Sequence, residues 1–301
     1  MPEIILHHYS ISTFSERVRL ALGLKGLSWR SVTIPAAMPK PDLLPLTGGY
    51  RRTPVMQIGA DVYIDSQRIA TELEARFPAP TLFPGGSTGL TLAGVKWADA
   101  FFRAGLHFAI AATSSAWPAE FLRDRQALFP DIDFAGCNAE HARAQLRANA
   151  SLVEEQLVDG RAFLGGEAPG LWDIHAWTVP WFTRGVPGGD VVYAGLARLA
   201  AWEQRVNALG EGRRIECTAS DAIEIARAAT PQTLGTCDPD DVQGLRADMA
   251  VEVTPDDTQR GGVRGTVVTA TCNEIAVLRT DARCGEIVVH FPRLGYRVTR
   301  L

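Results

Sequence analysis

The sequence predicts an α/β domain, then an all-α domain and a small all-β domain. The first 80 residues alternate between strand and helix patterns, whereas residues 90–229 carry apolar side chains at helical spacing. Beyond Thr230, apolar and polar residues alternate between short turns, as in strands with one buried face. We expect the three domains over 1–80, 87–229 and 236–301, a number that suits a chain of 301 residues.

The first domain is expected to start with a strand over 4–9. Ser12 then opens a helix that ends at Gly23 and Gly26, and a second extended run follows. Two strands joined by a tight turn and a further helix complete the domain. This βαβ–ββα order predicts a mixed sheet. The later elements are expected over 29–34 (strand), 35–49 (loop), 53–58 and 61–64 (strands), 65–77 (helix) and 78–86 (a linker rich in Pro and Gly).

The second domain is expected to be entirely helical. Asp173 stands where a side chain reaches back to the start of a helix, although Gly170 lacks the oxygen of a full capping box. The predicted helices cover 90–116, 119–128, 139–158, 172–183 and 193–208.

The third domain has about 65 residues, enough for a small barrel, but such a segment can also fold only when docked on its neighbours. We keep both interpretations and expect a barrel-like domain. Its predicted strands cover 249–254, 263–271, 274–280, 286–292 and 296–301.

Composition excludes several classes of protein. The net charge is −4, without long runs of one sign, so a nucleic-acid partner is not expected. The N-terminus has no basic start followed by a long apolar run, and Asp99, Arg103 and His107 interrupt the most apolar helix. Secretion and a membrane span are therefore not expected, and we place the protein in the cytoplasm.

The five cysteines are scattered and never form a CxxC pair. This spacing argues against a disulfide framework and a structural zinc site. His7 and His8 are neighbours on a strand and point to opposite faces, so they are not expected to share a metal ion. We expect no metal. The cysteines are Cys137, Cys217, Cys237, Cys272 and Cys284.

Ser12 is the first candidate for chemistry, because it lies where a strand meets the positive end of a helix. A hydroxyl and free N–H groups at this place would stabilise an anion. A thiol with a pKa of about 8.5 is mostly protonated at neutral pH, so such donors could favour its thiolate. The alternative is that Ser12 only caps the helix.

Three segments together, 12–19, 52–55 and 64–66, resemble the N-terminal domain of the glutathione transferases. In that family a thioredoxin-like domain precedes an all-helical domain, and the resemblance covers about residues 3–225. Ser12-x-x-Ser15 looks like the active-site motif of the tau, zeta and omega classes. The resemblance implies the glutathione transferase fold, glutathione as cosubstrate and Ser12 as the catalytic residue.

The same resemblance implies a glutathione-binding set. Pro54 falls at the family's cis-proline, which would present the main chain of Val55 to the cysteinyl residue of glutathione. Asp65 and Ser66 would hold the γ-glutamyl ammonium and carboxylate, and Arg52 would pair with the glycyl carboxylate. The alternatives are a turn proline, an ordinary capped helix and a solvated arginine.

An electrophile pocket is expected to be lined by aromatic and histidine side chains, although each of these is also a candidate core residue. The main candidates are Tyr9, Phe14, Phe101, His107 and Trp177, with Trp97 and Trp181 as further ones.

The sequence therefore predicts a detoxifying, homodimeric glutathione transferase that acts on a hydrophobic electrophile. Two alternatives stay open. One is a non-catalytic binding or scaffold protein with this fold, in which the C-terminal β domain holds a protein partner. The other is a glutathione-dependent lyase, isomerase or dehalogenase, which would use the same residues.

Overall fold

The computed structural model describes residues 3–233, 235–257 and 261–301, and its contacts divide the chain into two compact units. The sheet unit comprises Met1–Val18, Ser28–Leu73 and Arg213–Leu301. The helical unit comprises Arg19–Leu27 and Glu74–Gly212.

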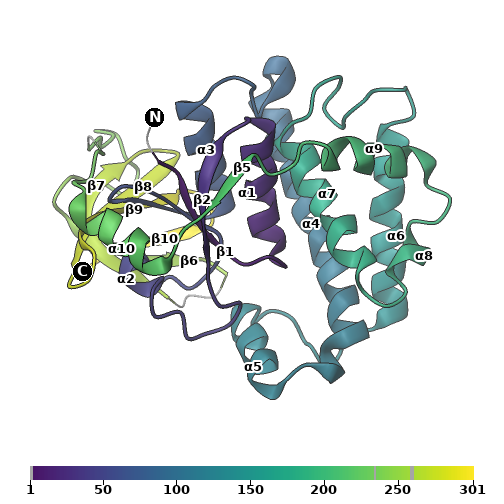
Figure 1. Ribbon diagram of the computed structural model, residues 1–301, viewed down its shortest axis with the longest axis horizontal. Coiled ribbons are helices and arrows are strands. Elements are labelled where there is room, and N and C mark those ends of the chain that lie inside the picture. Colours follow the sequence, from purple (N-terminus) through teal and green to yellow (C-terminus); the bar gives the residue numbers. More distant parts are fainter. Residues whose placement is uncertain (1–2, 234, 258–260) are drawn as a thin grey trace. The chain divides into compact units, whose positions relative to one another are not determined.

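The sheet unit holds one ten-stranded sheet in the order β10-β6-β7-β8-β9-β4-β3-β1-β2-β5 (Figure 1). The strands are β1 Ile5–His8, β2 Ser28–Thr33, β3 Val55–Ile58, β4 Asp61–Ile64, β5 Arg213–Glu216, β6 Ala250–Pro255, β7 Val263–Ala270, β8 Glu274–Asp281, β9 Gly285–Pro292 and β10 Tyr296–Arg300. The helices that contribute to this unit are α1 Thr13–Leu24, α2 Leu44–Thr47, α3 Ser66–Arg76 and α10 Ala219–Ala228.

The N-terminal strands form the mixed sheet that the sequence predicts. β1 runs parallel to β2 and antiparallel to β3, and β3 runs antiparallel to β4. Both outer strands of this group have a partner from the C-terminal part of the chain, because β5 pairs with β2 and β9 pairs with β4, each in parallel. The backbone groups of two edge strands are thus hydrogen-bonded to later strands.

The C-terminal strands continue this sheet and share its core. Val253 and Val289 belong to the same cluster of buried residues as Ile5 and Val62. α10 packs Ile223 into that cluster as well. The expected division, with a separate β domain over 236–301, therefore differs from the observed contacts. The strand order is also linear from β10 to β5 rather than closed as in a barrel. The physical reason is that β9 pairs with β4, so that the apolar side chains of both strands are buried in one core.

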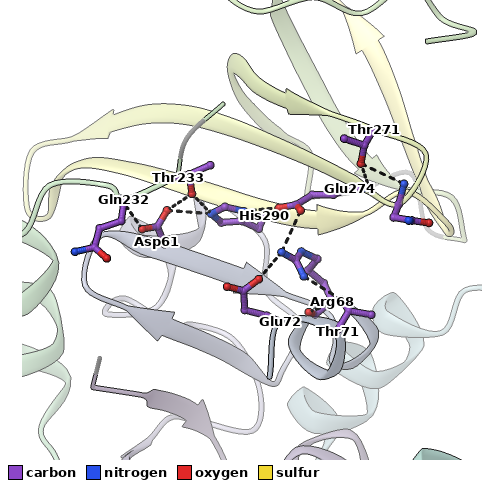
Figure 2. Close-up of polar contacts among 10 residues, drawn as sticks. Asp61, Arg68, Thr71, Glu72, Gln232, Thr233, Thr271, Glu274 and His290 are labelled. Carbon is purple, nitrogen blue, oxygen red and sulfur yellow. Dashed lines mark hydrogen bonds and ion pairs between the residues drawn. The ribbon is translucent and has the colours of Figure 1, made fainter. Parts of the chain in front are cut away.

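A buried polar network joins β4 to the C-terminal strands (Figure 2). His290 on β9 lies between two carboxylates, with Nε2 3.1 Å from Asp61 Oδ1 and Nδ1 2.6 Å from Glu274 Oε1. The Thr233 hydroxyl donates to Asp61 as well, and Arg68 on α3 contacts Glu274 Oε2 at 3.1 Å. Since both ring nitrogens face carboxylate oxygens, the arrangement suits an imidazolium that donates twice.

The helical unit is built from α4 Thr88–Thr113, α5 Ala119–Leu128, α6 Ala139–Gln156, α7 Leu171–Arg184, α8 Gly189–Val192 and α9 Ala197–Asn207. α4 packs against both α6 and α7. Asp173 in the first turn of α7 accepts hydrogen bonds from the N–H groups of Leu164 (2.7 Å) and Gly170 (3.0 Å) and from the indole of Trp202 (2.8 Å). The predicted role of Asp173 at this helix start is confirmed.

Among the described residues, none of the helices combines the length and the apolar character needed to cross a membrane. The five cysteines are free thiols.

Candidate functional site

The register of the sheet brings the predicted glutathione-binding segments to one end of neighbouring strands. His7 near the end of β1 is paired with Val55 at the start of β3, and Val55 is paired with Ile64 at the end of β4. The segments that follow β1 and β4 and the segment that precedes β3 therefore lie at the same end of these three strands. Ser12, Pro54 and Asp65 lie on these three segments.

Ser12 lies just before α1 and is 5% exposed. Its Oγ accepts a hydrogen bond from the N–H of Ser15 at 3.2 Å, and its carbonyl accepts one from Glu16 at 2.9 Å. Ser12 therefore caps the helix, as the alternative interpretation proposed. Capping uses a lone pair of the oxygen, so the hydroxyl hydrogen is still available to donate to an anion.

The peptide bond between Thr53 and Pro54 is cis, the state that the resemblance implies. Lys40 supports this segment: its Nζ donates to Thr53 Oγ1 at 2.9 Å and to the carbonyl of Arg51 at 3.0 Å, and it lies 5.6 Å from the centre of the Tyr9 ring. Lys40 is 3% exposed. Sequence reasoning missed this residue. The available signal was a lysine within a proline-rich loop, in a chain whose cations are nearly all arginine.

Asp65 connects β4 to α3 in the left-handed backbone region, with φ of 77°. A non-glycine residue in this region is strained and is held there by its surroundings. Its Oδ1 accepts from the N–H of Gln67 at 2.9 Å, and its Oδ2 accepts from the hydroxyl of Tyr296 at 3.2 Å. Ser66 follows as the first residue of α3 and is 7% exposed.

Arg52 pairs with Asp257, with Nη2 2.7 Å from Oδ1. Burial alone would lower the pKa of Arg52, but the bond to this carboxylate raises it. Asp257, like Tyr296, comes from the C-terminal part of the chain. Arg52 therefore has a carboxylate partner in this structure, and two partners of the candidate site lie where no site residue was predicted.

The residues predicted for the electrophile pocket differ in burial. Tyr9 and Phe14 in the sheet unit are half-buried. In the helical unit Phe101 is fully buried, and Trp177 is 5% exposed and donates its indole N–H to the carbonyl of Glu203. These two are packing residues, because they lie on α4 and α7 where the helices contact each other. His107 is half-buried, and burial lowers its pKa. Trp97 and Trp181 are half-buried beside Phe101 and Trp177.

Two comparisons decide the family. Residues 6–81 match the model of the glutathione S-transferase N-terminal domain. A glutathione-transferase-like protein from Pseudomonas syringae is 35% identical, with a TM-score of 0.82, and the match covers 100% of both chains. This chain belongs to the glutathione transferase family. Because this match covers the whole of both chains, it includes the C-terminal strands β6 to β10.

Other structures of the family match a smaller part of this chain. A transferase from Ceriporiopsis subvermispora in complex with glutathione is 18% identical with a TM-score of 0.56, and the match covers 69% of this chain and 97% of that one. A β-etherase from Sphingobium sp. is 18% identical with a TM-score of 0.54, over 68% of this chain and 95% of that one. No curated protein matches the sequence. The thioredoxin-like region and the helical domain are thus the common transferase fold.

Proposed function

We propose that this transferase binds glutathione at the end of β1, β3 and β4 and activates its thiol for attack on a hydrophobic electrophile. The observation that carries the proposal is the register that aligns His7, Val55 and Ile64. In this arrangement Ser12, Pro54 and Asp65 belong to neighbouring segments rather than to three distant ones.

Each group then has a separate role. The N–H and hydroxyl of Ser66 at the start of α3 would bind the γ-glutamyl carboxylate, and Asp65 would bind the ammonium. The main chain of Val55 would pair with the cysteinyl residue as an added strand does. Arg52 would bind the glycyl carboxylate and would exchange its contact with Asp257 for this ligand.

Ser12 would donate its hydroxyl hydrogen to the thiolate. The thiol proton leaves to solvent, and the sulfur then forms a bond to an electrophilic carbon while the leaving group takes the electron pair. Stabilising the thiolate lowers the thiol pKa. Each pKa unit corresponds to about 1.36 kcal/mol of preference for the thiolate over the thiol. No step requires a metal. A cytoplasmic homodimer acting in detoxification belongs to the same proposal.

Calorimetric titration of reduced glutathione tests the proposal. We expect Ser66→Ala to weaken binding about tenfold or more, because it removes a hydrogen bond to a charged group. Ser220→Ala is the matched control, since Ser220 is an exposed serine in the first turn of α10. No binding of millimolar glutathione by the wild-type protein would refute the proposal and favour a scaffold function.

Ser12→Ala should act on the thiol rather than on affinity. We expect the bound thiol to titrate about one pKa unit higher in this variant, measured by its thiolate absorbance as a function of pH. An unchanged thiol pKa would remove Ser12 from the catalytic role and leave it as a helix cap.

A further inference from the structure

Tyr296 brings the C-terminal strands into direct contact with Asp65. It is the first residue of β10, is 8% exposed, and places its hydroxyl 3.2 Å from Asp65 Oδ2 and 3.1 Å from the hydroxyl of Tyr50. Its ring packs against that of Phe291, with centroids 5.4 Å apart. The hydroxyl is therefore held in place by the core of the sheet unit.

The directions of these hydrogen bonds follow from chemistry. An ionised carboxylate only accepts, so Tyr296 donates to Asp65 and Tyr50 in turn donates to Tyr296. Burial, followed by the charge of Asp65, raises the pKa of Tyr50 above its ordinary value, and burial also raises the pKa of Tyr296. Both phenols therefore keep their protons at neutral pH and the chain of donors is maintained.

Asp65 has one oxygen fixed by its own helix and one by this tyrosine. Oδ1 accepts from the N–H of Gln67, while Oδ2 accepts from the hydroxyl of Tyr296 on β10. The left-handed backbone at Asp65 directs the side chain to this position. Without the phenol, the carboxylate would lose a directional hydrogen bond that fixes the position of Oδ2.

We propose that Tyr296 is a positioning residue of the glutathione site, which orients the Asp65 carboxylate toward the ammonium group of the ligand. The C-terminal strands, which are an addition to the common transferase fold, thereby set how well the site recognises the γ-glutamyl end. This inference rests on the proposed function and adds to it a residue outside the thioredoxin-like region.

The test uses two ligands that differ only at the ammonium group, S-methylglutathione and its N-acetylated form, titrated into the full-length protein by calorimetry. We expect Tyr296→Phe to lower the affinity for S-methylglutathione about five- to tenfold and to leave the affinity for the acetylated ligand unchanged. Asp65→Asn should have a larger effect on the same ligand. The double variant should bind no more weakly than Asp65→Asn, because both substitutions remove one interaction.

Tyr193→Phe is the matched control, since Tyr193 is a buried tyrosine of the helical unit whose hydroxyl contacts Thr183. If Tyr296→Phe fails to fold, Tyr50→Phe removes the donor behind Tyr296 and should weaken S-methylglutathione about two- to threefold. Equal loss of both ligands, or no loss of either, would overturn the role of Tyr296. A wild-type protein that binds neither ligand would refute the proposed function itself, and the inference with it.

Discussion

Replacing His290 with leucine is expected to lower the free energy of unfolding of the sheet unit by about 3–5 kcal/mol. Leucine has a similar volume but no charge, so the buried carboxylate of Asp61 would lose its cationic partner. The Asp61 and His290 side chains are 2% and 3% exposed, which leaves water little access to replace the lost interaction. Hydrogen exchange of the β4 and β9 amides measures this free energy within the unit concerned.

The pH dependence distinguishes loss of charge from loss of packing. Burial alone would lower the pKa of His290, but its bonds to Asp61 and Glu274 raise it above the ordinary 6.5. Its stabilisation is therefore complete below about pH 6.5 and is lost as the pH rises through the raised pKa. In the leucine variant this loss should disappear, because the group that titrates is absent.

The carboxylates set the acid limit of the same network. Burial alone would raise the pKa of Asp61 and of Glu274, but the bonds to His290 and their other partners lower both. Their stabilisation is present above the ordinary values of 3.8 and 4.5 and is lost as the pH falls through the lowered ones. His141→Leu, at an exposed histidine on α6, should change stability by less than about 0.5 kcal/mol. An equally small effect of His290→Leu would contradict the network's role.

Asp173→Ala is expected to destabilise the helical unit by about 3–5 kcal/mol, because it leaves three buried donors without their acceptor. These donors hold together the segment before α7, the start of α7 and the indole of Trp202 on α9. Asp173 is 1% exposed, so water cannot easily take its place. Urea unfolding followed by tryptophan fluorescence gives the loss directly.

The chain offers a control at the same position of another helix. Asp221 on α10 accepts from the N–H of Thr218 at 3.4 Å, as Asp173 accepts from Gly170, but it is exposed. Asp221→Ala should therefore cost less than about 1 kcal/mol. Similar losses in the two variants would show that burial does not decide the value of this cap.

Elements with a strong local pattern could be predicted from the sequence. The helix over 119–128 agrees with α5, and the alternating strands over 263–271 and 286–292 agree with β7 and β9 within one residue. Two elements after residue 208 were missed. β5 is exposed along its whole length and carries no apolar alternation, so only its pairing with β2 defines it as a strand. α10 is an amphipathic helix that was included in the helical domain although it packs on the sheet.

The candidate site was predictable only in its N-terminal half. Ser12, Pro54 and Asp65 were found because their segments resemble a known pattern. Asp257 and Tyr296 lie more than 190 residues further along the chain, after Asp65. The local sequence around Asp257 and Tyr296 does not indicate that these residues contact Arg52 and Asp65. Such contacts follow from the packing of the C-terminal strands in the shared core of the sheet unit, which periodicity does not reveal.

The position of β9 beside β4 also governs the order in which the protein can be completed on the ribosome. β4 ends at Ile64, but its outer neighbour begins only at Gly285. At roughly 5–20 residues per second, synthesis leaves this edge without its final partner for about 10–45 seconds. During this time the outer edge of the nascent thioredoxin-like strands is exposed to wrong strand pairing. The exposure ends when β9 has emerged and can pair with β4.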